Sequence, residues 1–305
     1  MKHKGILYGL LAYTAWGLFP IYWKALKTVP PIEILSHRMV WSFVFMLGIL
    51  AVTRRWSWIR PALQQPKIMG AFLLTAVFLS VNWFVYIWGV NAGYIVETAL
   101  GYFINPLVNV LLGYLFLRER LRLGQGLAVA LALGGVLYLT ILYGSLPWIA
   151  LTLAFSFGFY GLLRKTAVLD SVEGLSLETA WLFLLAAGLL ITFEARGTGS
   201  LGHSSLQVNL LLIGSGVVTA VPLLFFAASA RLVTLTTLGI LQYVAPTLQF
   251  LIGVFVYGEA FSRHQLVGFS FIWLALLVYT LEGVLHNRRG RMDLRPLSVP
   301  GQAGD

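Results

Sequence analysis

Ten long apolar runs divide this chain of 305 residues. The hydrocarbon core of a bilayer is about 30 Å thick and takes a helix of about 20 apolar residues, so each run has close to the length of one membrane span. Only 10% of the residues are charged, compared with about 25% in soluble domains. This composition excludes an ordinary soluble enzyme, and the sequence predicts an all-α integral membrane protein with ten transmembrane helices. The runs lie near 5–25, 32–52, 68–90, 95–117, 122–143, 146–163, 175–193, 207–230, 235–257 and 264–286.

The basic residues fall mainly on one side of this predicted membrane path. With ten spans, the two termini share a side, and sixteen of the 21 Lys and Arg residues lie there. The opposite side receives only Lys24, Lys27, Arg196 and Arg263. Because short loops rich in Lys and Arg stay cytoplasmic, both termini are predicted to be cytoplasmic. The net charge of +10 therefore indicates orientation, and it does not indicate binding to nucleic acid.

The two halves of the chain resemble each other when one is shifted by 140 residues along the other. The matched residues are Pro106 with Pro246, Glu119 with Glu259, and Gln125 with Gln265. Each half holds five spans, and this odd number makes the second half enter the membrane in the opposite sense. Such inverted-topology repeats are typical of secondary transporters, which work by alternating access around a site near the midplane. The expected units are a first five-helix repeat, 1–145, a second, 146–286, and a disordered cytoplasmic tail, 287–305.

The second span carries three ionisable residues, Glu33, His37 and Arg38. Such residues are costly inside a membrane and face a cavity or a partner. Arg38 either lines the outward half of a solute path, where it meets a carboxylate or phosphate, or snorkels to the interface with Glu33 or Glu97 as its partner. His37 is either a packed histidine or a proton relay. No carboxylate is expected at the midplane, so proton coupling is unsupported, and facilitated flux and antiport both stay open.

Amides and prolines recur in the middle of spans four and nine. In span four, Tyr102, Asn105 and Asn109 share one face, and Pro106 frees the carbonyl of Tyr102. Span nine repeats this arrangement around a helix-kinking Pro246. A kinked helix with a free carbonyl and nearby amides favours a substrate-binding surface, although contacts between helices are the alternative. The candidates for the substrate cavity are His37, Arg38, Asn82, Trp83, Tyr102, Asn105, Asn109, Gln242, Tyr243 and Gln249.

Three glutamates at span ends are candidates for capping or gating, namely Glu33, Glu119 and Glu259. Nearby arginines such as Arg263 are the expected partners of the last two, and plain surface carboxylates are the alternative. The chain has no cysteine, its aspartates all lie outside the spans, and it carries no phosphate-binding Walker sequence. We therefore expect no metal, no cofactor and no enzymatic activity.

Several strings of residues resemble the RarD subgroup of the EamA-type drug/metabolite transporters, known as chloramphenicol-sensitivity proteins. The strings are Glu33-Ile34-Leu35-Ser36-His37-Arg38, Asn82-Trp83, Leu100 to Asn109, and Gln242-Tyr243 with Pro246. The resemblance covers about residues 5–290. It implies a transporter of the bacterial inner (plasma) membrane that exports small metabolites or drugs.

That resemblance implies membrane lipids and a small-molecule substrate as partners. It does not establish chloramphenicol as the substrate, and it leaves the direction of transport, the coupling ion and the oligomeric state open, with a homo-oligomer as one alternative. A non-transporting membrane sensor or a lipid scramblase is the rival interpretation.

Overall fold

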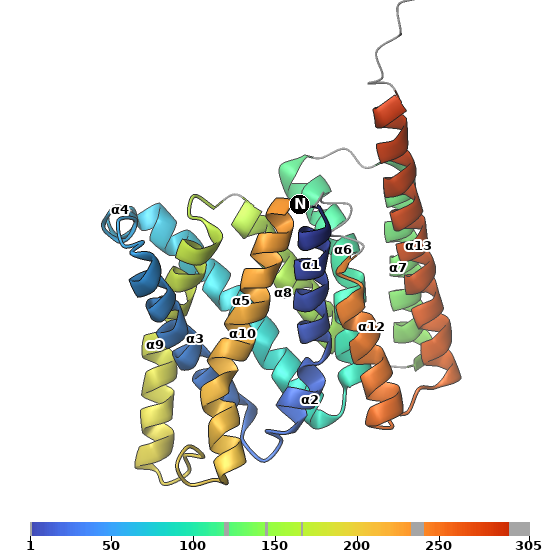
Figure 1. Ribbon diagram of the computed structural model, residues 1–305. Helices are drawn as coiled ribbons and strands as arrows, with labels where there is room; N and C mark the ends of the chain where they lie inside the picture. Colours follow the sequence, from blue (N-terminus) through green and yellow to red (C-terminus); the bar gives the residue numbers. More distant parts are fainter. Residues whose placement is uncertain (1, 119–121, 144–145, 166, 233–240, 293–305) are drawn as a thin grey trace, which may run out of the picture.

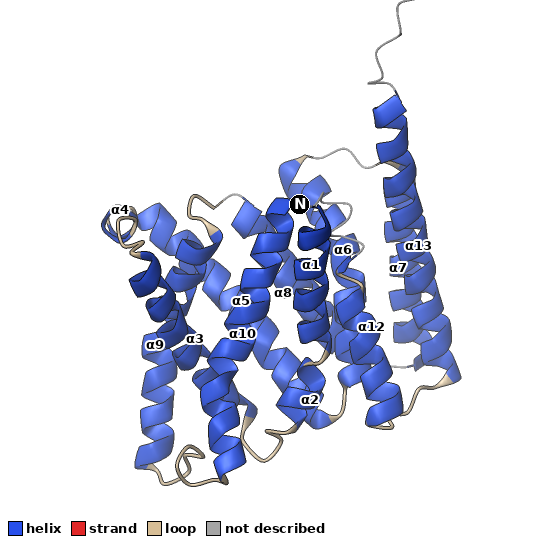
Figure 2. Ribbon diagram, in the orientation of Figure 1, coloured by secondary structure: helices blue, strands red, loops and turns tan. Residues whose placement is uncertain are grey.

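A computed structural model describes residues 2–118, 122–143, 146–165, 167–232 and 241–292, and the elements within these ranges are all helical (Figures 1 and 2). The helices are α1 (Lys2–Gly17), α2 (Phe19–Lys24), α3 (Pro31–Thr53), α4 (Ile59–Leu63), α5 (Pro66–Ala92), α6 (Ile95–Leu117), α7 (Leu123–Tyr143), α8 (Trp148–Lys165), α9 (Ser171–Ala195), α10 (Leu206–Leu232), α12 (Val244–Leu251), a π-helical turn η1 (Ile252–Val256), and α13 (Arg263–Met292). Eight helical segments are long and apolar enough to cross a membrane. Two shorter apolar helices, Trp148–Arg164 and Val244–Val256, lie where the other two spans were expected.

The helices form a bundle whose two ends are easy to identify. Figure 1 shows α7 and α13 packed side by side at one edge, and α3 and α9 packed together at the other. Between these edges α1 packs on α10, and α8 lies against α5 and α6. The beginning of α1 and the end of α13 lie at the same end of the bundle, which we call the terminal end (Figure 1). The opposite end, which carries α2, is called the far end.

Prolines and left-handed residues set several helix ends. Pro31 and Pro66 occupy the first turns of α3 and α5, where a missing N–H leaves no hydrogen bond unmade. At the terminal end, α3 and α6 stop at Arg54 and Arg118, whose φ values of 52° and 55° are left-handed. A left-handed residue ends a helix because it turns the chain away from the helix axis. Both of these helices therefore finish on a basic residue.

The helices α7 and α13 begin with the same hydrogen bond. The N–H of Arg122 donates to Gln125 Oε1 over 3.1 Å, and the N–H of Ser262 donates to Gln265 Oε1 over 2.8 Å. In α13, Ser262 Oγ also accepts from the N–H of Gln265, which completes a reciprocal capping box. The two glutamines that the 140-residue shift pairs thus hold the same position in their helices.

The structure moves the boundaries of three predicted spans. The first is broken between α1 and α2, with Pro20 in the first turn of α2. The seventh begins at Ser171 as α9, earlier than the predicted 175. The last continues as α13 to Met292, so its final turns reach into the predicted tail, and residues 293–305 lie outside the described residues. The earlier start adds about one turn to α9 before the predicted span.

Candidate functional site

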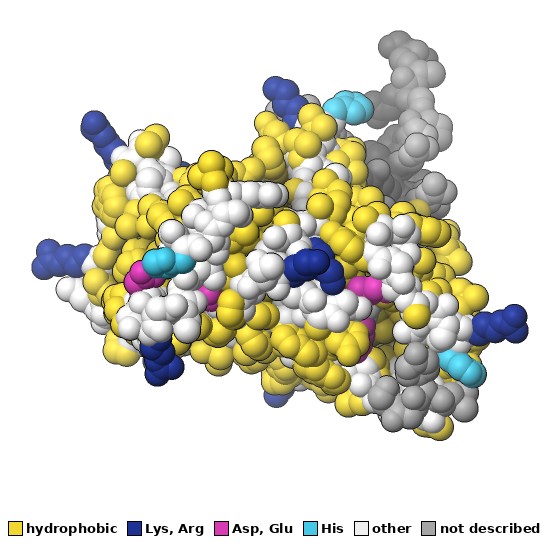
Figure 3. Space-filling view, turned by 90° about the horizontal axis from the view of Figure 1, so that it is seen from below, with side chains coloured by type: hydrophobic (Ala, Val, Ile, Leu, Met, Phe, Trp, Pro, Cys, Tyr) yellow, Lys and Arg dark blue, Asp and Glu magenta, His cyan; other side chains and the backbone are white. Residues whose placement is uncertain are grey.

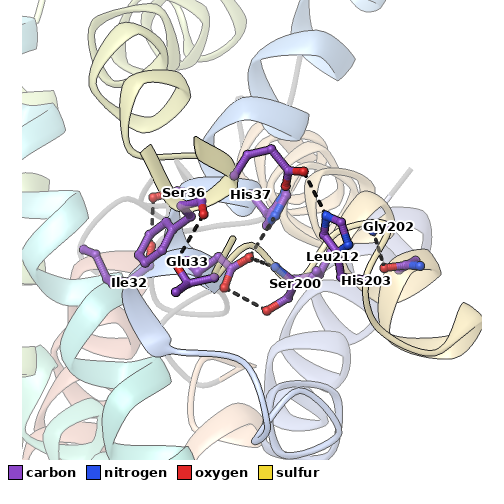
Figure 4. Close-up of polar contacts among 12 residues, drawn as sticks. Ile32, Glu33, Ser36, His37, Ser200, Gly202, His203 and Leu212 are labelled. Atoms are coloured by element: carbon purple, nitrogen blue, oxygen red, sulfur yellow. Dashed lines mark hydrogen bonds and ion pairs between the residues drawn. The ribbon is translucent and has the colours of Figure 1, made fainter. Parts of the chain in front are cut away.

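Glu33 joins the two halves of the chain at the far end of the bundle. It lies in the first turn of α3, and its carboxylate accepts hydrogen bonds from the backbone N–H and the hydroxyl of Ser200, at 2.6 and 2.8 Å. His37 Nε2 lies 3.8 Å from the same carboxylate, and Figure 4 shows the carboxylate between the two partners. Glu33 and His37 are both almost fully buried. The carboxylate therefore fastens α3 to the loop between α9 and α10.

Glu259 makes a second junction between the halves at this end. Its two carboxylate oxygens accept hydrogen bonds from the backbone N–H groups of Ile95 and Val96, each over 2.8 Å. These N–H groups belong to the first turn of α6, where they have no partner within the helix, and where a negative charge is favourable. The expected partner Arg263 forms no ion pair with Glu259 among the described residues. Glu119, its predicted counterpart, lies outside the described residues.

Further contacts complete this junction around Lys24, which ends α2. The ammonium of Lys24 donates to the carbonyl of Val90 at the end of α5 over 3.0 Å, and it lies 5.5 Å from the ring centroid of Tyr257. The hydroxyl of Tyr22 donates to the carbonyl of Leu211 in α10. Viewed toward the far end, the surface shows a few acidic and basic side chains set among apolar and uncharged ones (Figure 3). Of these contacts, the one between Tyr22 and Leu211 and the one between Lys24 and Tyr257 join residues 1–145 to residues 146–286 at the far end.

Replacing Glu259 with alanine should destabilise the protein, because two N–H groups at the start of α6 would lose their acceptor. We expect a loss of about 1–2 kcal/mol, the usual cost of removing a helix cap. Burial raises the pKa of the Glu259 carboxyl above its usual value, and this effect is larger than the lowering of the pKa by the hydrogen bonds from Val96 and Ile95. A raised pKa in the folded state contributes stability that is present at low pH and lost as the pH rises through that pKa.

The loss caused by the alanine variant should therefore be larger at about pH 4 than at about pH 8. Thermal-unfolding midpoints in detergent at the two pH values measure it. Glu173→Ala is a suitable control, because Glu173 has no hydrogen bond or ion pair among the described contacts. A loss that grows with pH would contradict the assigned role of burial.

The predicted polar residues of α5 lie against α8. Asn82 Nδ2 donates to the carbonyl of Leu153 over 3.0 Å and to the hydroxyl of Ser156 over 3.1 Å. Its Oδ1 accepts the hydroxyl hydrogen of Tyr102, from α6, over 3.2 Å. Asn82 is 1% exposed. In this conformation, its amide joins three helices.

Along α6, the next two amides differ in exposure. Asn105 Nδ2 donates to the carbonyl of Ala154 in α8 over 3.2 Å, and Asn109 Nδ2 donates to Asn105 Oδ1 over 2.9 Å. Asn105 is buried, whereas Asn109 is exposed although it lies well inside a helix of 23 residues. Pro106 lies between them inside α6. An exposed amide at this depth favours contact with a polar cavity over contact with lipid.

The corresponding residues of the second half are arranged differently. Pro246 lies in the first turn of α12, where a proline starts a helix, whereas Pro106 lies inside α6. Gln242 and Tyr243 lie in the turn just before α12, partly buried. Gln249 Nε2 donates to the carbonyl of Trp16 over 3.0 Å. That carbonyl needs an outside donor because Pro20, four residues later, has no N–H.

Arg38 lies in a cage of aromatic rings inside the bundle. Its guanidinium carbon is 3.9 Å from the ring centroid of Trp83, 5.0 Å from that of Trp23 and 5.8 Å from that of Phe19. The side chain is 3% exposed, so it does not snorkel to the interface. Neither Glu33 nor Glu97, the partners considered from the sequence, pairs with it among the described residues. Arg38 and Trp83, which the sequence predicts as residues of the substrate cavity, are therefore in direct contact.

Glu178 in α9 is a buried charge that the sequence analysis did not identify. It is fully buried, its Oε1 lies 3.7 Å from Arg164 Nη1, and its Oε2 lies 3.4 Å from the hydroxyl of Tyr160. The predicted span begins at 175, so Glu178 falls within its first turn. Because α9 begins at Ser171, the carboxylate lies two turns inside the helix.

A closer use of the 140-residue shift would have found Glu178. The shift pairs Ser36 with Ser176 and Trp41 with Trp181. It therefore places Glu178 in α9 at the position that Arg38 occupies in α3. Arg38 and Glu178, two buried charges of opposite sign, thus lie equally far from the starts of their helices at Pro31 and Ser171.

A surface cleft of about 250 Å³ lies away from these residues. Its lining includes Trp88, Glu97, Trp148 and Gln265. None of the residues predicted from the sequence to form the substrate cavity contributes to it. The cleft is therefore no support for the predicted site.

Comparison with known proteins finds similarity in sequence to a family of membrane transporters. Residues 3–141 match the EamA-like transporter family. The chain is 46% identical over 286 residues to Protein RarD of Salmonella typhi, covering 94% of this chain and 97% of that protein. It is 47% identical over 291 residues to the uncharacterized transporter YojE of Bacillus subtilis, covering 94% of this chain and 97% of that one. A solved crystal structure with 21% identity superposes with a TM-score of 0.59, over 91% of this chain and 97% of that one, and shows the fold alone.

Proposed function

Because this chain belongs to the EamA-like transporter family and is a multi-pass membrane transporter, we propose that it exports small metabolites or drugs by alternating access. In this proposal, a central polar cavity between two inverted five-helix repeats opens to one side of the membrane at a time. The observation that carries the proposal is the set of contacts at the far end, where Glu33 binds Ser200 and Glu259 binds the start of α6. Transport would require these contacts between the halves to break.

The proposed repeats, residues 1–145 and 146–286, are supported by local geometry. Gln125 and Gln265 make the same hydrogen bond at the start of α7 and α13. The helices α1 and α10 pack together, and so do α8 and α5. In span order, α1 and α10 are the first and eighth spans, and α8 and α5 are the sixth and third. A shift of five spans therefore converts the first pair into the second. The same packing in both halves is what a pseudo-two-fold axis in the membrane plane would produce.

The proposed path runs beside α6. Asn109 is exposed inside that helix, and it lies closer to the terminal end than Asn105, to which it donates. Asn82 and Tyr102 continue the polar series toward the far end. A cavity reached from the terminal end would place Asn109 first and the closed junction last. This order supports a conformation in which the proposed cavity opens at the terminal end.

The terminal end is proposed to face the cytoplasm of a bacterium, so that both termini lie on the cytoplasmic side of the plasma membrane. The span assignment from the sequence predicts sixteen of the 21 Lys and Arg residues on this side, and cytoplasmic loops carry such an excess. The proposed partners are the surrounding lipids and a small-molecule substrate. Opening from this side would load a solute from the cytoplasm, which is the direction of export.

A disulfide between α6 and η1 should stop transport, because it would hold the far end closed. A Cβ atom at Gly253 would lie 3.3 Å from Cβ of Ile95, close to the separation of about 3.5–4.5 Å found in disulfides. The chain contains no cysteine, so the variant Ile95→Cys/Gly253→Cys has a single defined pair. We expect saturable flux in reconstituted vesicles, lost on oxidation and restored by a reductant.

The vesicles should first be tested with amino acids, phenicols and small organic acids as solutes. The single variants Ile95→Cys and Gly253→Cys, treated with the same oxidant, are the matched controls. Unchanged flux in the fully oxidised pair would refute alternating access. Absence of saturable flux for every solute in the unmodified protein would favour a sensor or a scramblase.

A further inference from the structure

Arg38 is a buried cation without a counter-ion among the described residues. Its Nε and Nη1 atoms are buried and have no hydrogen-bond partner there. Charged side chains buried in a protein are normally paired, because an unpaired charge in a low-dielectric interior costs several kcal/mol. An arginine cannot lose its charge to escape this cost. The arrangement therefore needs an explanation outside the described contacts.

The aromatic cage does not supply the missing partner. Ring faces attract a cation, which explains the contact with Trp83 at 3.9 Å. A guanidinium, however, carries its five N–H groups in its own plane, and these groups require oxygen acceptors. A ring stacked on the ion leaves this requirement unmet. The cage thus holds the guanidinium in place while its donors stay available.

Two further donors beside Arg38 also lack acceptors. The indole Nε1 of Trp23 and the hydroxyl of Tyr86 are buried without a hydrogen-bond partner among the described residues. The ring of Trp23 lies 5.0 Å from the guanidinium, and Tyr86 belongs to the same buried cluster as Trp23 and Trp83. A buried cluster that offers a positive charge together with N–H and O–H donors in need of a partner is complementary to an anion.

Among the described residues, the two buried carboxylates and the half-buried carboxylate of Glu97 are engaged elsewhere. Glu33 accepts from Ser200, and Glu178 lies beside Arg164 and Tyr160. The carboxylate of Glu97 receives hydrogen bonds from the backbone of Ile149 and a neighbouring residue. None of them can neutralise Arg38 without leaving its own partner unsatisfied.

We propose that Arg38 binds the negatively charged group of the transported solute, which makes the substrate a small organic anion. The expected ligand carries a carboxylate or phosphate, which a guanidinium can bind through two hydrogen bonds, next to an apolar or aromatic body that suits Trp23 and Trp83. The inference rests on the proposed transport function, and it adds the chemical class of the solute. Since Arg38 is 3% exposed here, the ligand enters after the cage opens.

Binding to purified full-length protein in dodecyl maltoside tests this assignment without any flux. The probes are radiolabelled phenylacetate and phenyl phosphate, with phenylacetamide as the neutral counterpart of the first. We expect the wild-type protein to bind at least one of the two anions and to prefer phenylacetate over its amide. Arg38→Gln should weaken anion binding about 10–100-fold, the loss expected for hydrogen bonds to a charged group, whereas Arg38→Lys should lose less. Arg60→Gln, which removes an exposed arginine, should leave binding unchanged.

The wild-type comparison of acid with amide keeps the test decisive if Arg38→Gln fails to fold. Failure of both anions to bind, equal binding of acid and amide, or full binding by a folded Arg38→Gln variant would each overturn the proposal. Added phosphatidylglycerol forms a separate arm. If it displaces the bound anion, the site belongs to a lipid headgroup, and the assignment to a solute is wrong. Anion binding that persists in a protein without flux would contradict the transport proposal alone.

Discussion

Replacing Gly216 with alanine should cost about 3 kcal/mol of stability, although it adds a single methyl group. Gly216 lies in α10 where this helix crosses α3. A Cβ atom at position 216 would overlap the carbonyl group of Trp41 and would lie 2.7 Å from the backbone nitrogen of Ser42. These are backbone atoms inside a helix, so no side-chain rotation can make room. The helices would have to separate, and overpacking of this kind typically costs about 1–3 kcal/mol or more.

Gly48→Ala is the matched control for this change. Gly48 also lies in a long helix, α3, but a Cβ atom there would meet nothing within 4 Å. Alanine is more favourable than glycine inside a helix by about 0.5–1 kcal/mol, so this variant should be as stable as the wild type or slightly more stable. Thermal unfolding in detergent, with size-exclusion chromatography, measures both variants. Equal midpoints for Gly216→Ala and Gly48→Ala would show that α3 and α10 do not pack as described.

Replacing Arg164 with methionine should cost a similar amount, about 3 kcal/mol, because it leaves the carboxylate of Glu178 buried without its cation. Removing one member of a buried pair is far more damaging than removing both. The double variant Arg164→Met/Glu178→Gln should therefore recover most of the lost stability. A double-mutant cycle, measured by unfolding in detergent, gives the interaction energy of the pair.

Another arginine–glutamate pair among the described residues provides the control. Arg122 Nε lies 3.0 Å from Glu282 Oε1, but the two side chains are 36% and 19% exposed. Pairs in contact with solvent contribute about 0–1 kcal/mol, so Arg122→Met should have a small effect. A larger loss for Arg122→Met than for Arg164→Met would mean that burial does not determine the importance of these charges.

The sequence predicts the helical membrane fold well because its signal is physical and local. A span needs about 20 apolar residues in a row, and this requirement can be checked run by run. The boundaries are less predictable, because a helix continues past its apolar stretch wherever the backbone can keep its hydrogen bonds. This is why the predicted span begins at 175 although α9 begins at Ser171. Contacts such as that of Gly216 with Trp41 depend on how two helices cross, which no single segment specifies.

The candidate site was predictable in its residue types and less so in its contacts. Helical spacing placed Asn105 and Asn109 on one face, and a hydrogen bond joins them. The spacing could not show that Asn105 binds α8 while Asn109 is exposed. Similarly, the sequence indicated Glu259 as a cap but suggested an arginine as its partner. Its actual partners are backbone N–H groups of α6, which are invisible in a pattern of side chains.

The buried guanidinium of Arg38 also links the protein to the membrane potential. An elementary charge that crosses the whole membrane gains or loses about 2.3 kcal/mol per 100 mV. If opening of the bundle moved Arg38 through a quarter of that field, a potential of about 100 mV would shift the balance between the two conformations by about 0.6 kcal/mol. A bound anion would cancel the charge and remove this effect. The empty protein would then respond to voltage while the loaded protein would not, so a change in potential would alter the return step and leave the solute-carrying step unaffected.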